Sequence, residues 1–491
     1  MDVRLPIATQ KMGICQTPFM LTLSPFHAYA DAKTEIDNGK SCNKAHSMDG
    51  FSIGLISAGV LAAVQLVLLA LQAFEHHRYA ARRLQKKAYR QPTGQALVII
   101  PCRGLEHNLE ENLAGFFRQD YAYYSLRFVV QSRDDPAVSV IERLINDHPN
   151  VLAELVVAGS ATNEAQKVHN LRAATHTIPE QVRFLVFADS DASPSPSWLR
   201  ALISRLEESR AAAVTGYRWF VPTQGTFREA VVASLNGSYA MLMAGKTPNL
   251  VWGGTWATTR ENFQKLGIRD AWEGQICDDL VVARLLLRRG LRVQYEPACL
   301  VATACYSSTR EMIAFIHRQY FLLRHVIPTW WLFDTFVGNY HILVFWLGVG
   351  AAVFGWGDDV RSSGLAAAGI IFVLNWIRAE FRAAAARVYF PQLAQQPPFR
   401  RIFWWDRLAN LLIGTVGFVL SVSAGLRRSV SWRGITYHIE RGGRVRVCHG
   451  SPLGNSLCCS SDERSPEGAG REEAVPLAVV GAQAESPRSA A

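Results

Sequence analysis

At 491 residues the chain is long enough for two or three domains, and with 49% hydrophobic and 19% charged residues it is more apolar than an average soluble domain. Its formal net charge of +10 does not indicate nucleic acid binding, because much of the positive charge directly follows an apolar segment. The nine cysteines form no CxxC pair and no zinc-type spacing, so they predict no zinc site.

The first 47 residues are expected to be a disordered leader. They have a faint signal-peptide pattern, with Ala-Tyr-Ala at residues 28–30, but Pro18 and Pro25 interrupt the apolar run that such a peptide needs. A cleaved signal is the alternative interpretation. Met48 stands just before the next segment and is a candidate start of the protein.

Residues 51–74 carry no formal charge and are long enough to cross a bilayer. We therefore predict a transmembrane helix over residues 48–75. A basic run, residues 76–90, follows directly, which indicates the cytoplasmic side of the membrane and favours contact with anionic lipid. The soluble region that comes next, residues 91–328, is accordingly predicted to be cytoplasmic.

Within residues 91–328, apolar strand patterns alternate with helical patterns. The predicted strands are residues 96–104, 126–136, 153–159 and 183–191. The predicted helices between them are residues 108–119, 137–149 and 165–178. This alternation predicts an α/β fold with a mostly parallel sheet covered on both faces. In such sheets ligands bind at the carboxyl ends of the strands, which is where the acidic clusters of this chain lie.

Residues 315–331 are amphipathic, basic and aromatic, and they lead directly into a membrane segment. On their own they predict an interfacial helix, with Trp330 and Trp331 in the aromatic belt. Three further apolar segments follow, so we predict a multi-pass membrane protein with transmembrane or interfacial helices over residues 329–428. The segments are residues 332–356, 365–377 and 408–426.

The number of crossings is in conflict with the charge pattern. Four full crossings would place the end of the chain on the side opposite the catalytic domain, whereas Arg427, Arg428 and Arg433 favour the same side. One segment, with residues 365–377 the candidate, is therefore expected to be re-entrant or interfacial. Residues 429–491 are predicted to be a basic segment followed by a disordered tail rich in Ser, Pro and Glu.

The sequence "FADSD" places Asp189 and Asp191 at the end of a predicted strand. In an extended chain residues two apart point to the same side, so both carboxylates can address one cation. Hard oxygen ligands without His or Cys favour Mg²⁺ or Mn²⁺, which commonly steadies a departing diphosphate. The alternative is that Ser193 or Ser195 caps a helix and the aspartates are merely solvated.

Two more acidic pairs stand at element boundaries. Asp134 and Asp135 precede Pro136, and they could hydrogen-bond a nucleotide base or ribose or simply form an Asp-Pro turn. Asp278 and Asp279 open an amphipathic helix, where negative charge is favoured by the helix dipole. A carboxylate in a cleft at that place could also take a proton from an attacking hydroxyl group.

In this order, the segments resemble the membrane-bound glycosyltransferases of family 2, which have a GT-A fold, and among them the ceramide glucosyltransferase-like branch. The resemblance covers about residues 97–332 and the flanking membrane segments. "VSWRGITYHI", after the last apolar segment, is also similar to bacterial members. The other motifs that carry it are "IIPCRG", "NLAGFFRQDY", "VVQSRDDPAV", "QKVHNL", "FADSD", "WGGTWATTRENF", "CDDLVVARLLLRRG" and "HRQY".

For the donor, the resemblance implies a UDP-sugar. Asp134 or Asp135 would lie near the uracil and ribose, and because Ser132 stands where relatives often have an acid, the choice between the two stays open. Lys167 and Asn170 would lie near the phosphates. Close approach of the substrate is implied at two glycines, Gly253 and Gly254.

For the reaction, the resemblance implies Asp189 and Asp191 as the metal-binding pair. Asp279 would act as general base on the acceptor hydroxyl, with Asp278 as the fallback. A Q-x-x-R-W type motif that holds the diphosphate would fall on two neighbouring residues, Arg318 and Gln319. "HRQY" departs from that motif because it lacks the tryptophan.

The resulting hypothesis is an inverting hexosyltransferase that moves a sugar from a UDP-sugar to the hydroxyl of a ceramide-like lipid, with bound Mg²⁺ or Mn²⁺ and no nucleic acid partner. The sequence does not indicate an oligomeric state. A polysaccharide synthase and a polyprenyl-phosphate glycosyltransferase are alternatives. A non-catalytic membrane scaffold is disfavoured by the intact acids at Asp189, Asp191 and Asp279.

Overall fold

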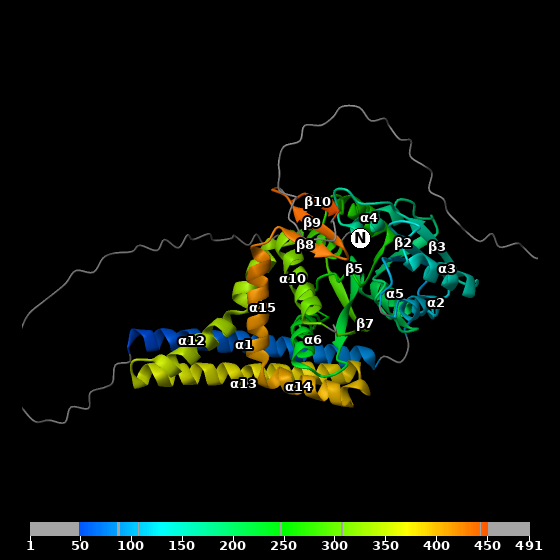
Figure 1. Ribbon diagram of the computed structural model, residues 1–491. Helices are drawn as coiled ribbons and strands as arrows, with labels where there is room; N and C mark the ends of the chain where they lie inside the picture. The colour runs from blue at the N-terminus through cyan, green and yellow to red at the C-terminus, as the bar shows by residue number, and fades with distance from the viewer. Residues whose placement is uncertain are drawn as a thin grey trace, which may run out of the picture. The chain divides into compact units, whose positions relative to one another are not determined.

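In the computed structural model, the region between the first and second apolar segments forms a seven-stranded sheet (Figure 1). All residues that the structure describes belong to one unit, Met48–Ala491. They are residues 49–85, 89–106, 108–245, 248–305, 308–441 and 443–449. The expected leader, residues 1–47, and the expected disordered tail beyond residue 449 lie outside these ranges.

The strand order of the sheet is β3-β2-β1-β4-β6-β5-β7. Strands β3, β2, β1 and β4 run parallel, β6 runs antiparallel to both of its neighbours, and β5 is parallel to β7. The expected mostly parallel α/β sheet is therefore confirmed. The strands are β1 Gln95–Pro101, β2 Tyr124–Val130, β3 Leu152–Val157, β4 Val182–Ala188, β5 Ala213–Val221, β6 Thr255–Thr259 and β7 Val293–Ala304.

Hydrophobic residues of the central strands alternate between two cores, one on each face of the sheet. Leu97 and Ile99 of β1 face one core, whereas Val98 and Ile100 face the other. This explains why the strand reads as a continuous apolar run rather than an alternating one. The helices of this region are α2 Leu109–Phe117, α3 Ala137–Asp147, α4 Gln166–Ala174, α5 Trp198–Ser209, α6 Phe227–Ala240, α7 Arg260–Lys265, α8 Ile268–Ala271 and α9 Asp279–Arg288.

Three stretches of helix among the described residues are long and apolar enough to cross a membrane. They are α1 Gly50–Leu84, the run Pro328–Phe354, and α13 Asp358–Tyr389. The run Pro328–Phe354 consists of α11 Pro328–Leu332, the π-helix η1 Phe333–Gly338 and α12 Tyr340–Phe354. In Figure 1 they run alongside one another, and Gly59 of α1 lies against Ala367 of α13, close enough that a Cβ would be 3.2 Å from that methyl. Small residues permit such close helix packing in membranes.

The expectation that residues 365–377 are the re-entrant or interfacial segment is wrong. These residues lie inside α13, a 32-residue helix that is long enough to cross. The bent element is the last one, in which α14 Pro397–Leu408 and α15 Asn410–Gly425 meet at 80°. The expectation relied on the short length of the uncharged stretch. The helix, however, continues through the charged residues on both sides of residues 365–377. A short 3₁₀ turn, η2 Leu393–Gln395, precedes α14.

The basic segment after α15 forms a small antiparallel sheet that the sequence did not predict. Its strands are β8 Ser429–Trp432, β9 Ile435–Ile439 and β10 Val445–His449, in the order β10-β9-β8. The hydroxyl of Tyr437 accepts a hydrogen bond from the backbone N–H of Gln166 at 3.2 Å, which fixes this sheet to the start of α4. The amphipathic helix α10 Thr309–Val326 lies beside α15 (Figure 1).

Candidate active site

Lys167 joins two acidic clusters that are far apart in the sequence. Its Nζ lies 2.8 Å from Oδ1 of Asp189, which directly follows β4, and 3.1 Å from Oδ1 of Asp278, which precedes α9. The side chains of Lys167 and Asp278 are 15% and 3% exposed, so this is a largely dehydrated ion-pair network. The carboxyl end of β4, the first turn of α4 and the start of α9 thus meet at one point.

Gly253 shows how closely the backbone approaches this network. Its N–H donates to Oδ2 of Asp279 at 2.9 Å. A Cβ on Gly253 would lie 2.9 Å from Nζ of Lys167 and 3.1 Å from Oδ2 of Asp279, so any other residue would displace at least one of these side chains. Gly254 is restricted for another reason, since its Cβ would lie 2.2 Å from the indole ring of Trp252.

The charges of the network shift one another's pKa values. Burial alone would lower the pKa of Lys167, but the three neighbouring carboxylates outweigh it and the net shift is upward. Burial alone would raise the pKa of Asp189, but the positive charges of Lys167 and Arg218 outweigh it and hold it below its ordinary value. For Asp278 burial prevails: it raises the pKa to about 6, with Lys167 opposing and Asp279 reinforcing the shift.

Asp278 and Asp279 are therefore not equivalent. Among the described residues, Oδ2 of Asp278 is buried and has no hydrogen-bond partner, and the residue is 2% exposed. Asp279 is partly exposed, and its carboxylate accepts hydrogen bonds from the backbone N–H groups of Gly253 and Leu280. Asp279 is thus the more accessible of the two carboxylates.

Arg218 is a site residue that sequence reasoning missed. Its Nη2 lies 3.0 Å from each oxygen of Asp191 and 3.7 Å from Oδ2 of Asp189, although the residue is only 8% exposed. Its guanidinium also stacks on Trp252, 5.4 Å from the ring centre. The sequence did contain a signal for this residue. Arg218 stands within an apolar strand, and a buried arginine needs an acidic partner.

The Asp189-Ser190-Asp191 segment is also held by the loop that follows β1. The hydroxyl of Ser190 donates to Oε2 of Glu106 at 2.9 Å, and Glu106 forms an ion pair with Arg433 at the turn between β8 and β9. Arg433 in addition donates from Nη1 to the carbonyl of Arg103 at 3.1 Å. The turn of the small C-terminal sheet therefore contacts the loop that positions the two aspartates, which sequence reasoning did not foresee.

Arg318 lies on α10 with its guanidinium carbon 4.9 Å from the centre of the Trp432 ring, on β8. Its positive charge is near enough to help hold the pKa of Asp189 down, after Lys167 and Arg218. The neighbouring Gln319 is exposed. The structure thus brings Arg318 toward the Asp189-Ser190-Asp191 segment.

The remaining predicted donor residues are engaged elsewhere. Oδ1 of Asp135 accepts from the backbone N–H groups of Gly104 at 2.8 Å and Ala137 at 2.9 Å, so it holds the loop after β1 to the start of α3, and Asp134 is exposed. Asn170 is 3% exposed, and its amide bonds to Gln166 and to a β2 carbonyl. These hydrogen bonds fix local structure rather than reach the Lys167 network.

The carboxylates of the site are suited to a divalent cation that a bound substrate also helps to hold. No group of three or more His, Cys, Asp or Glu side chains able to hold a metal is found among the described residues. Mg²⁺, however, is usually held by one or two carboxylates together with substrate phosphates and water. Asp189 and Asp191, with side chains 26% and 28% exposed, fit that arrangement.

Comparison with known proteins gives a family match over most of the chain. The family model described as glycosyl transferase family 21 matches residues 60–445. Ceramide glucosyltransferase 1 of Caenorhabditis elegans is 34% identical over 128 residues, and ceramide glucosyltransferase 3 of the same organism 33% identical over 110 residues. The alignments cover 26% and 22% of this chain and only 27% and 23% of those relatives.

Two solved structures show weaker similarity. The mannosyltransferase PcManGT from Pyrobaculum calidifontis, in complex with GDP-Man and Mn²⁺, has a TM-score of 0.38 and 20% identity, and the match covers 74% of this chain and 99% of that one. TarS 1–349 of S. aureus has a TM-score of 0.32 and 13% identity, covering 70% and 96%.

Proposed function

This chain belongs to glycosyl transferase family 21, and we propose that it transfers a hexose from a UDP-sugar to the hydroxyl group of a ceramide-like lipid with inversion at the anomeric carbon. The observation that carries the proposal is the meeting of Asp189, Lys167 and Asp279 at the carboxyl end of β4. That edge is where nucleotide ligands bind in open α/β sheets. The relatives named ceramide glucosyltransferase support the lipid acceptor.

Asp279 is proposed as the general base. The acceptor hydroxyl attacks the anomeric carbon from the face opposite the UDP group, its proton goes to the Asp279 carboxylate, and the bond between that carbon and the diphosphate oxygen breaks. The hydrogen bond from Gly253 orients the carboxylate before the substrate arrives. Asp278 is less suited, because it is buried and therefore less accessible to an acceptor hydroxyl than Asp279.

The leaving diphosphate would be held by cations that converge from three elements: Lys167 on α4, Arg218 on β5 and Arg318 on α10. Positive charge fixed in place before the reaction stabilises the negative charge that develops on the leaving group. Asp189 and Asp191 would hold Mg²⁺ or Mn²⁺, which supplies further stabilisation of that charge when bound.

The membrane orientation that we propose places the catalytic domain and the C-terminal sheet on the same, cytoplasmic side. The hydrogen bond between Tyr437 and Gln166 requires both to lie on one side of the bilayer. After α1, the run Pro328–Phe354 crosses outward and α13 crosses back, so the bent pair α14–α15 returns without crossing. Basic residues in the last turn of α1 and after α15 agree with the cytoplasmic side.

The test uses the full chain in detergent or nanodiscs, supplied with radiolabelled UDP-sugars and ceramide. We expect label in the organic phase, lost in Asp279→Asn while UDP binding is retained, and unchanged in Asp270→Asn, whose carboxylate is exposed on α8. A labelled polymer would identify a polysaccharide synthase, and label on an added polyprenyl phosphate would identify that other class. No transfer with any acceptor would contradict the proposal.

A further inference from the structure

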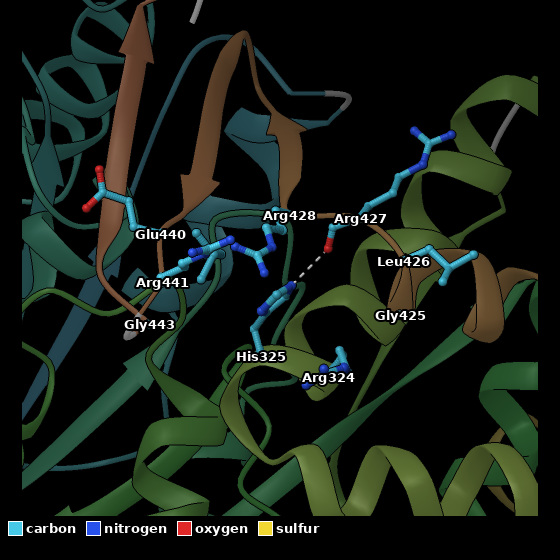
Figure 2. A pocket seen from close by; sticks show the side chains of 10 residues that line it. Arg324, His325, Gly425, Leu426, Arg427, Arg428, Glu440, Arg441 and Gly443 are labelled. Carbon is cyan, nitrogen blue, oxygen red and sulfur yellow. Dashed lines mark hydrogen bonds between the residues drawn. The ribbon is translucent and has the colours of Figure 1, made fainter. Parts of the chain in front are cut away.

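A basic cavity of about 500 Å³ lies at the junction of α10, α15 and the C-terminal sheet, away from the Asp189 site. We call it the basic pocket. Its basic residues come from the end of α10, from the link between α15 and β8, and from the turn between β9 and β10, and are Arg324, His325, Arg427, Arg428 and Arg441. Figure 2 shows Arg428 and Arg441 extending toward the space beside the His325 ring.

The positive charge of the basic pocket is not balanced by carboxylates. Glu440 is the acidic residue of the lining, and it forms an ion pair with Arg446 at 2.5 Å. Among the described residues, no ion pair is formed by Arg324, Arg428 or Arg441. Like charges that face one another without a counter-charge repel, so the lining is suited to an anion.

Further contacts agree with an anionic ligand. Nε of Arg324 is buried and has no hydrogen-bond partner among the described residues. His325 lies close to Arg427, whose carbonyl is 3.1 Å from Nε2, while the side chain of Arg427 points away (Figure 2). Burial lowers the pKa of His325, the hydrogen bond to the Arg427 carbonyl opposes that shift, and the charges of Arg324 and Arg428 add to it.

The position of the basic pocket indicates where the anion comes from. Its wall includes Gly425 and Leu426, at the very end of the apolar helix α15, and Leu426 is 84% exposed. Arg324 also stacks on Trp331, at 5.0 Å from the ring centre, and Trp331 lies at the beginning of the candidate membrane span Pro328–Phe354. Cations beside exposed apolar and aromatic side chains are the pattern of a lipid headgroup region.

We propose that the basic pocket binds the phosphate group of an anionic membrane lipid. The pocket shares α10 with Arg318, and residues 318 and 325 lie on the same side of the helix because they are two turns apart. It also shares the C-terminal sheet with Trp432, on which Arg318 stacks. Lipid binding therefore stabilises the helix and the sheet that hold Arg318.

The experiment measures binding directly, so its outcome does not depend on the proposed enzymatic function. Purified full-length protein is titrated with short-chain phosphatidylglycerol, with short-chain phosphatidylcholine, and with inorganic phosphate, and both retained lipid (native mass spectrometry) and melting temperature are recorded. We expect saturable binding and a higher melting temperature with phosphatidylglycerol alone. Equal stabilisation by inorganic phosphate would overturn the lipid assignment, and equal binding of phosphatidylcholine would overturn a site for anionic lipid.

Variants of the pocket make the test specific. Arg428→Gln and Arg441→Gln change exposed residues and are expected each to weaken phosphatidylglycerol binding about fivefold, and together about 25-fold. Arg428→Lys keeps the charge and should retain most of the binding, which shows that any loss in the Gln variants is not misfolding. Arg310→Gln removes an exposed arginine from the start of the same helix and should change nothing. Unchanged binding in the double variant would overturn the proposal.

Discussion

The guanidinium of Arg218 holds both carboxylate oxygens of Asp191 at 3.0 Å from inside the central sheet. We expect Arg218→Gln to lower kcat/KM for the UDP-sugar by more than tenfold, because Asp191 then loses its fixed partner and the diphosphate loses a cation. Arg218→Lys should recover part of the activity, since it restores the charge but not the guanidinium that stacks on Trp252. Initial rates at varied donor concentration measure both, and equal rates in wild type and Arg218→Gln would contradict the role.

Gly253→Ala is expected to inactivate the enzyme without unfolding it. The added Cβ would lie 2.9 Å from Nζ of Lys167. Either the Lys167 side chain must leave its carboxylate partners, or the backbone that leads into β6 must shift. Gly350→Ala, in α12, is the matched control, because a Cβ there meets nothing within 4 Å. Transfer rates and melting curves of both variants separate the effects; full activity in Gly253→Ala would show that the close approach is unimportant.

The raised pKa of Asp278 makes a prediction about pH. Burial raises it from 3.8 to about 6, so the native state holds this proton more tightly than the unfolded state does. The resulting contribution to stability is present below pH 3.8 and is lost as the pH rises through about 6. Asp278→Asn, which cannot ionise, should therefore gain melting temperature relative to wild type over this range. A constant difference between the two proteins from pH 4 to 7 would contradict the shift.

The pair Arg382–Asp406 links α13 to α14 by two hydrogen bonds of 2.7 and 2.9 Å, with both side chains almost fully buried. Arg382→Met should cost about 3–5 kcal/mol in stability, because it leaves the Asp406 carboxylate buried and unpaired. The double variant Arg382→Met/Asp406→Leu should be closer to wild type. Arg133→Met, which breaks an exposed pair with Glu142, should cost at most about 1 kcal/mol. Thermal unfolding in one detergent compares all three.

Removal of divalent metal should abolish transfer reversibly. A chelator is expected to reduce the rate to background, and added Mg²⁺ or Mn²⁺ to restore it, because in the proposed mechanism Asp189 and Asp191 would provide only part of a coordination sphere that the diphosphate would complete. Asp191→Asn should need more metal for half-maximal rate than wild type. Full activity in the presence of chelator would show that Lys167, Arg218 and Arg318 neutralise the diphosphate by themselves.

The sequence was most informative where local pattern and tertiary structure agree. The four strands that precede the Asp189-Ser190-Asp191 segment were predicted from their apolar runs, such as residues 184–188 of β4, which are fully buried. That the acidic pair at residues 189 and 191 and the pair at 278 and 279 belong to one site was predicted only through the family resemblance, since no local pattern records which strand ends are neighbours. Lys167 was singled out in the same way, and its bridging position became visible only in three dimensions.

What the sequence could not provide depends on long-range pairing. Arg218 is one charge within an apolar strand, and its partner is set by the strand order rather than by spacing. The sheet β8–β10 was assigned only as a basic segment because Arg433 and its neighbours mask the short alternating pattern of β9. The bend between α14 and α15 was not foreseen, because only residues 408–426 had been singled out as apolar and α14, which precedes them, had not been assigned as a helix.

The hydrogen bond between Gln166 and Tyr437 also has a consequence for biosynthesis. The helix that carries Lys167 emerges from the ribosome long before β9 does, so the contact between α4 and β9 forms only after every hydrophobic helix has been synthesised. An unfinished polypeptide, or one whose final bent pair is inserted the wrong way round, cannot bring Tyr437 to Gln166. The contact that fixes the C-terminal sheet to α4 therefore arises only in molecules whose integration into the bilayer is complete.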